Sequence, residues 1–279
     1  MRQSFLSRPA EAQAGWMPRM SGFIEKINMY KHHEESIENM IQHYKENKEI
    51  KALFLIGSVA TDTARMDSDI DGVAVVSQKY FEEKKKTNEE CESIFGKCTY
   101  QGGYFDVHFI SRKGMEELAE KGSEPMRNRF TNARALYCDE PGLPELTAKI
   151  AVFQKQDAVA KQLRYYCAFR QYHSYYWKCC KPEGFMKHHT ANAMVFNLYR
   201  LILLENEILF PSVRKLEEFV KNAPNKPDNI IEKCQRFQAS LNDDDASELI
   251  KSYESWTTYN YPKEFQFIAN NFMEPWEWD

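Results

Sequence analysis

Three aspartates in the first half of the sequence have the spacing expected of a metal site. Asp69 and Asp71 are separated by one apolar residue and lead into the apolar stretch 73–76, which is typical of a β-strand. Side chains of an extended segment alternate between its two faces, so both carboxylates point the same way. A third acid is expected beside them, and Asp106 supplies it from the alternating stretch 104–109.

Carboxylates held this close together favour a divalent cation. Without a cation Asp69 and Asp71 would repel each other, and one of them would tend to take up a proton; a bound ion removes that penalty. A set of oxygen ligands favours Mg²⁺ or Mn²⁺ over zinc. The sequence therefore predicts a site for Mg²⁺ or Mn²⁺.

A candidate phosphate site precedes the carboxylates. The apolar run 53–56 stops at Gly57-Ser58, and the polar residues that follow are typical of a tight turn with a short helix between two strands. Gly57 allows a close approach to the backbone, and Ser58 can open the helix, whose N-terminal amides suit an anionic phosphate. Phosphate site and carboxylates are thus predicted on adjacent strands.

The same acids also imitate the start of an EF-hand calcium loop. From Asp67 onward there are acids at loop positions one, three and five, and Gly72 stands at position six. The imitation fails at position twelve, where Gln78 replaces the bidentate glutamate. The strand-like stretch 73–76 also occupies the second half of the loop, so the pattern favours a carboxylate site on strands.

These motifs resemble the DNA polymerase beta-like nucleotidyltransferase superfamily. Its pattern is Gly-Ser, about ten residues, Asp-x-Asp on a strand and one more Asp on a later strand, and the match covers roughly residues 50–140. Many relatives carry Arg-Gly where this chain has Thr61-Asp62. Arg65 and Ser68 fit the Arg…Ser-Asp-x-Asp sequence with which the family motif usually ends. The resemblance implies an α+β fold, in which a nucleotidyltransferase palm of mixed β-sheet and helices precedes an all-α helical-bundle domain.

The resemblance also implies roles for residues. Asp69, Asp71 and Asp106 would hold the metal ions and form the catalytic site, and Asp106 is the first candidate for general base, with Glu205 and Glu207 as alternatives. The residues of the motif predicted to contact the nucleoside triphosphate are Gly57, Ser58, Arg65 and Ser68. Lys187 is added as a candidate phosphate contact from its place near the start of the helix predicted over 185–204, and not from a family motif.

A palm followed by a helical domain is similar to the small-molecule branch of the superfamily, which includes aminoglycoside and lincosamide nucleotidyltransferases. The expected reaction is transfer of AMP from ATP to a hydroxyl of a small molecule. Two alternatives remain: an antitoxin-like or regulatory module that acts on a protein partner, and addition of nucleotides to nucleic acid.

Composition bears on these alternatives. The chain of 279 residues has 14% aromatic and 28% charged residues and a net charge of -4. This balance disfavours a general nucleic-acid binder, which needs a basic surface.

Seven cysteines without CxxC pairing indicate reduced thiols. No apolar run reaches membrane-spanning length, and residues 1–20 lack a signal-peptide core, so a cytoplasmic protein is expected.

The predicted organisation is an N-terminal extension over 1–33, a nucleotidyltransferase domain over 34–145 and a helical domain over 146–279. Within it, helices are predicted over 34–48, 79–95, 112–121, 148–178, 185–204, 228–241 and 244–256, and an edge strand over 133–138. The long segment 148–178 is rich in tyrosine.

Overall fold

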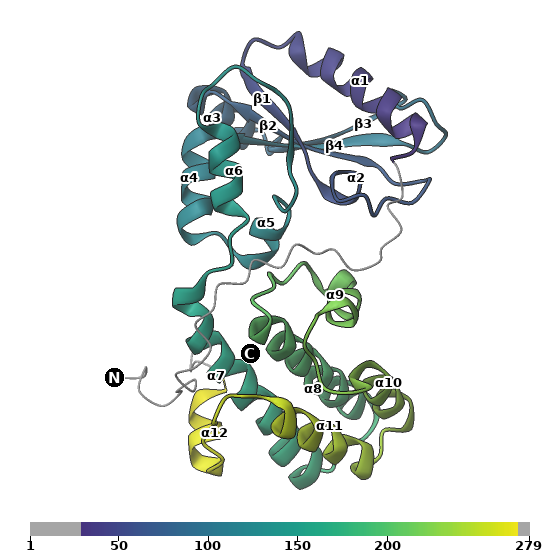
Figure 1. Ribbon diagram of the computed structural model, residues 1–279, viewed down its shortest axis with the longest axis vertical. Coiled ribbons are helices and arrows are strands. Elements are labelled where there is room, and N and C mark those ends of the chain that lie inside the picture. Colours follow the sequence, from purple (N-terminus) through teal and green to yellow (C-terminus); the bar gives the residue numbers. More distant parts are fainter. Residues whose placement is uncertain (1–28, 273–279) are drawn as a thin grey trace. The chain divides into compact units, whose positions relative to one another are not determined.

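The computed structural model describes residues 29–272, and the contacts divide them into two compact units, 29–152 and 153–272. Most of the predicted N-terminal extension, residues 1–28, lies outside the described residues, as does the tail 273–279. The domain boundary predicted between 145 and 146 falls inside helix α6, which belongs to the first unit. Figure 1 labels the helices and strands of both units.

A mixed five-stranded sheet forms the centre of the first unit. Its strands, in spatial order, are β3 (Cys91–Phe95), β4 (Tyr104–Ser111), β2 (Ile70–Val76), β1 (Ile50–Leu55) and β5 (Arg134–Cys138). Strands β2 and β4 run parallel, and the other neighbours are antiparallel. The predicted edge strand is confirmed as β5.

Successive side chains of each strand point to opposite faces of the sheet, and both faces are apolar. Ile70 and Ala74 of β2 face a core with helix α1 (Lys31–Lys45), whereas Val73 and Val75 face a core on the opposite side. That second core is completed by α4 (Arg112–Lys121) and α6 (Leu143–Ile150), as Figure 1 shows. The three remaining helices of the unit are α2 (Gly57–Ala60), α3 (Gln78–Lys86) and α5 (Glu124–Asn128).

A buried arginine joins the helices on the second face. The Arg127 guanidinium donates hydrogen bonds to the backbone oxygens of Ala119 (3.0 Å), Gly122 (2.8 Å) and Ile150 (3.1 Å). Since Arg127 is fully buried, these bonds form away from water, where an unmade bond would cost most. They hold α4, α5 and α6 together as one layer beneath the sheet.

The second unit is entirely helical. Its elements are α7 (Lys155–Gln171), the π-helix η1 (Tyr172–Cys179), α8 (Gly184–Glu205), the 3-10 helix η2 (Val213–Lys215), α9 (Leu216–Asn222), α10 (Ile230–Ser240), α11 (Asp243–Trp256) and α12 (Phe265–Asn271). The core surrounds α8, whose segment 197–204 is buried on every side. The helices predicted over 185–204, 228–241 and 244–256 are confirmed as α8, α10 and α11, and so is the α+β fold class.

Two long helices predicted from the sequence are wrong in extent. The one over 79–95 ends at Lys86, because Asn88 adopts a left-handed backbone (φ 56°) and the residues after it pair with β4 as strand β3. The one over 148–178 is interrupted between α6 and α7. The residues of α6 pack into the core of the first unit and those of α7 into the core of the second, so the chain breaks where it passes from one core to the other.

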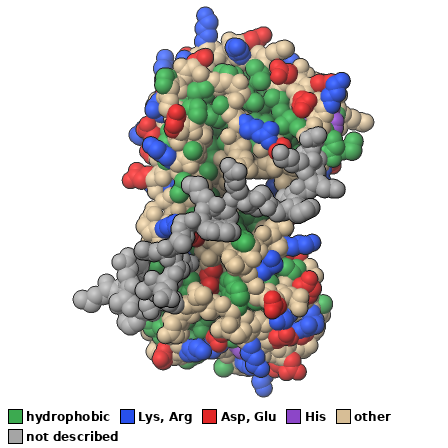
Figure 2. Space-filling model, viewed as in Figure 1, with side chains coloured by type: hydrophobic (Ala, Val, Ile, Leu, Met, Phe, Trp, Pro, Cys, Tyr) green, Lys and Arg blue, Asp and Glu red, His purple; other side chains and the backbone are tan. Residues whose placement is uncertain are grey.

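Charge is distributed evenly over the visible surface. Figure 2 shows acidic and basic side chains interspersed on both units, without a broad basic area on the face that it displays. No helix among residues 29–272 is long and apolar enough to cross a membrane.

Candidate functional site

The three aspartates meet at one end of the sheet. The parallel pairing of β2 and β4 places Asp71 directly opposite Asp106, and Asp69 lies just before β2 on the same face. One carboxylate oxygen from each residue comes within 4.8 Å of the other two. All three side chains are half-buried, so the cluster is open to a ligand.

The geometry of Gly57 brings the end of β1 against this cluster. Gly57 has φ +72°, and a Cβ added there would lie 2.7 Å from Cγ and 2.9 Å from Cβ of Asp71. The neighbouring Ile56 N–H donates to the backbone oxygen of Asp71 (3.0 Å). A residue without a side chain is therefore required both by the backbone conformation and by the space beside Asp71.

The turn from Ser58 to Ser68 is held by its own polar groups. The Thr63 N–H donates to the Ser58 oxygen (3.0 Å), and the Arg65 N–H donates to Oγ of Ser68 (2.9 Å). The Arg65 side chain extends into solvent, 80% exposed, and pairs with Asp67 at 3.0 Å. Ser68 thus shapes the turn, while the Arg65 guanidinium lies in solvent on the same turn.

Two further side chains of β4, Tyr104 and His108, interact with the carboxylates. Tyr104 makes a hydrogen bond with Asp69 that raises the pKa of the Tyr104 phenol. Burial lowers the pKa of His108, the Arg129 charge lowers it further, and Asp106 opposes both. Alternation along 104–109 puts Tyr104 and His108 on the face of Asp106, and the pairing of β4 with β2 brings Tyr104 to Asp69.

The remaining predicted residues lie in the helical unit. Lys187 is on α8, with Nζ 5.5 Å from the centre of the Trp177 ring. The Glu205 carboxylate accepts hydrogen bonds from Tyr253 and Thr257, both at 2.6 Å. Glu207 forms an ion pair with Lys155 at 2.7 Å. The structure describes each of these residues within its own unit, so their roles at the carboxylates stay predictions.

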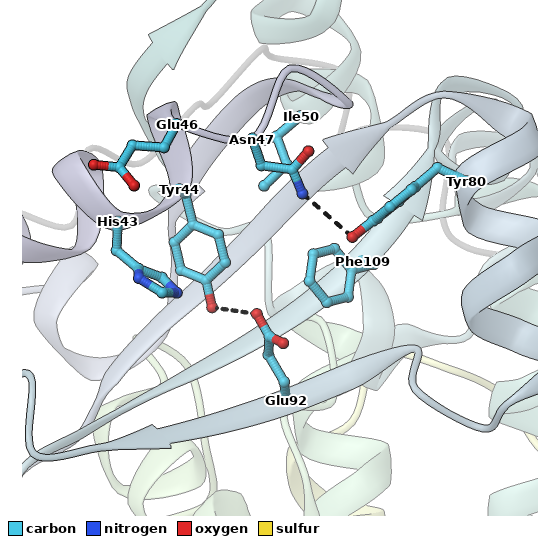
Figure 3. A pocket seen from close by; sticks show the side chains of 8 residues that line it. All are labelled: His43, Tyr44, Glu46, Asn47, Ile50, Tyr80, Glu92 and Phe109. Carbon is cyan, nitrogen blue, oxygen red and sulfur yellow. Dashed lines mark hydrogen bonds between the residues drawn. The ribbon is translucent and has the colours of Figure 1, made fainter.

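A cavity of about 380 Å³ opens on the other face of the sheet (Figure 3). It is lined by His43, Tyr44, Glu46, Asn47, Ile50, Tyr80, Glu92 and Phe109. The Tyr44 hydroxyl donates to Glu92 at 2.8 Å across it. Phe109 and Tyr44 belong to the core on the α1 side, whereas the aspartates project from the opposite face, so this cavity is separate from the carboxylate site.

The donor set fits a hard divalent cation. Asp69, Asp71 and Asp106 present only carboxylate oxygens, close enough for one ion to contact all three. Such ligands suit Mg²⁺ or Mn²⁺, and a cation would offset the repulsion among three neighbouring acids.

A family model matches the part of the chain that carries these aspartates. Residues 38–121 match the family model described as polymerase beta, nucleotidyltransferase. A crystal structure of a nucleotidyltransferase-like protein from Exiguobacterium sibiricum covers 79% of this chain and 75% of its own length, at 13% identity and a TM-score of 0.38. No curated protein matches the sequence. The family match spans β1 to α4 and includes all three aspartates: residues 38–121 form a nucleotidyltransferase domain of the DNA polymerase beta superfamily.

Proposed function

We propose that the chain transfers AMP from ATP to a hydroxyl of a small molecule such as an aminoglycoside or a lincosamide. The observation that carries this proposal is the convergence of Asp69, Asp71 and Asp106 within 4.8 Å, inside a nucleotidyltransferase domain. The free state of all seven cysteines supports the expectation that the protein works in a reducing compartment, the cytoplasm.

The carboxylates hold Mg²⁺ or Mn²⁺ in this proposal. When bound, the ion neutralises charge on the triphosphate and on the departing pyrophosphate, and it makes the attacking hydroxyl more acidic. Much of the rate acceleration then comes from positioning and electrostatics, as in other in-line phosphoryl transfers.

Residues of the turn after β1, together with Lys187, bind the triphosphate in this proposal. Gly57 lets the triphosphate approach the backbone beside Asp71, and Ser58, Arg65 and Ser68 contact phosphate oxygens from the same turn. Lys187 supplies a further cation from α8. Because Gly57 belongs to the β1 side of the cluster, the triphosphate lies on that side.

Asp106 accepts the proton of the acceptor hydroxyl. The acceptor oxygen forms a bond to the α-phosphorus, the bond between that phosphorus and the bridging oxygen breaks, and pyrophosphate leaves with the bonding electrons. Asp106 is favoured over Glu205 and Glu207 as base, because Glu205 already accepts bonds from Tyr253 and Thr257 and Glu207 is paired with Lys155.

A small acceptor is favoured over nucleic acid. The net charge is -4, and a protein that follows a nucleic-acid backbone needs a concentration of lysine and arginine to replace its counterions. The interspersed charges in Figure 2 offer no such surface on the face shown.

Single carboxylate substitutions test the assignment. Asp71→Asn and Asp106→Asn are each expected to lower pyrophosphate release with ATP, Mg²⁺ and an aminoglycoside or lincosamide panel by about 10³-fold or more, because each removes a metal ligand. Circular dichroism should show an unchanged fold.

Asp139→Asn is the matched control, since Asp139 is exposed at the end of β5 and outside the cluster. Appreciable transfer by either site variant would contradict the metal assignment. Transfer to a protein hydroxyl in a cell extract, with none to the small-molecule panel, would support the regulatory alternative instead.

A further inference from the structure

An exposed phenylalanine lies beside the carboxylate site. Phe95, the last residue of β3, is 72% exposed, although a large aromatic side chain gains most by burial. Its ring stacks on that of Tyr104, with the centroids 5.0 Å apart and the planes at 28°. The two residues pair directly across β3 and β4, so the strand register holds the rings together.

This ring pair lies on the same face of the sheet as the aspartates. Tyr104 and Asp106 are two residues apart on β4 and therefore share a face, and residues opposite each other on neighbouring strands point the same way. The hydrogen bond between Tyr104 and Asp69 connects the ring pair directly to the cluster. Strands are about 5 Å apart, so Phe95 lies roughly one strand spacing from the strand of Asp106.

The ring pair and Gly57 lie on opposite sides of the cluster. In the strand order β3-β4-β2-β1-β5, Gly57 follows β1 and contacts the Asp71 side, whereas Phe95 belongs to edge strand β3. In the proposed function, on which this inference rests, the triphosphate lies beside Gly57. An acceptor that approaches Asp106 from the side opposite Gly57 would therefore lie over β4 and β3.

We propose that Phe95 and Tyr104 form the acceptor-binding platform, on which the saturated, polyhydroxylated ring that carries the acceptor hydroxyl stacks. The C–H groups on one face of such a ring carry partial positive charge, which complements the negative face of an aromatic ring. The hydroxyl groups at the rim of the acceptor ring would then face Asp106. A flexible acyclic alcohol would gain much less from this platform.

Saturation-transfer NMR on the full chain tests the platform. The probe is methyl β-D-glucopyranoside, added to protein with Mg²⁺ and a non-hydrolysable ATP analogue. The wild type should transfer saturation to the C–H protons on one face of the sugar. Phe95→Ala should weaken that transfer about fivefold or more, and Phe95→Trp, which keeps an aromatic face, should retain it.

The matched control is Phe265→Ala, which removes another exposed phenylalanine (52%) from α12 in the helical unit and should change nothing. Equal transfer to wild type and Phe95→Ala would overturn the platform. So would the absence of transfer to a wild-type chain that binds the nucleotide, and either result leaves nucleotidyl transfer standing. A chain that binds no nucleotide would overturn the proposed function, and the platform with it.

Discussion

Gly57 is the residue at which backbone conformation and site chemistry depend on each other most closely. Gly57→Ala should weaken nucleotide binding and lower stability, because the left-handed backbone costs a side-chain-bearing residue about 1–2 kcal/mol and the new Cβ displaces the Asp71 carboxylate. Calorimetric ATP binding and thermal unfolding would measure the two effects.

Gly102→Ala is the control that separates backbone strain at a positive φ from displacement of the Asp71 carboxylate. Gly102 has a similar backbone (φ +82°), but an added Cβ there meets no atom within 4 Å. The Gly102→Ala variant should therefore be less stable than the wild type but bind the nucleotide equally well. If both variants bound ATP equally well, the close approach of Gly57 to Asp71 would have no functional role.

Among individual residues, the convergence of the three carboxylates was easier to predict from the sequence than the side chains that lie around them. Asp69, Asp71 and Asp106 were predictable because alternation within a strand assigns side chains to faces from the sequence alone. Phe95 was not predictable as a neighbour of Tyr104, because their contact depends on how β3 pairs with β4, and the segment containing Phe95 has helical composition. The alternation of Tyr104 with Asp106 was the one available signal.

At the scale of elements, the π-helix η1 contains a histidine that opposes stability in acid. His173 is buried, and neither ring nitrogen has a hydrogen-bond partner among residues 29–272. Burial, with the Lys178 and Arg170 charges, lowers the pKa of His173 from 6.5 to about 4, and Asp243 opposes the shift. Between pH 6.5 and 4 the unfolded chain therefore binds a proton that the folded chain does not, so stability falls as pH falls.

His173→Phe should reduce this loss. Because one pKa unit corresponds to about 1.4 kcal/mol, the wild type should lose roughly 2 kcal/mol more than the variant between pH 7 and pH 4.5. Urea unfolding followed by tryptophan fluorescence is a suitable measurement, since Trp177 lies in the same helix. His188→Gln, on the exposed start of α8, is the control. If the free energy of unfolding depended on pH equally in the wild type and in His173→Phe, His173 would not be the source of the acid sensitivity.

Element boundaries were less predictable than element types. The helix over 112–121 was predicted at the bounds of α4, because its apolar stripe and its serine cap are local features. The break between α6 and α7 has no proline or glycine to mark it, and it follows from which core each helix enters. Such a break is set by tertiary packing, which local patterns do not encode.

At the scale of the whole molecule, the division into a sheet unit and a helical unit was predictable from the change in periodicity along the chain. The net charge of -4 disfavoured a general nucleic-acid binder, and the face in Figure 2 has no broad basic area. The acceptor was not predictable, because a fold common to many transferases does not determine the molecule that it modifies.

The central claim, that the three aspartates form a metal-dependent nucleotide site, is tested most directly by calorimetric titration of ATP into the full chain. Binding should require Mg²⁺ and should weaken about tenfold or more in Asp69→Asn, because that carboxylate is one of the metal ligands. Absence of ATP binding to well-folded wild type, or Mg²⁺-independent binding that Asp69→Asn leaves unchanged, would contradict the claim.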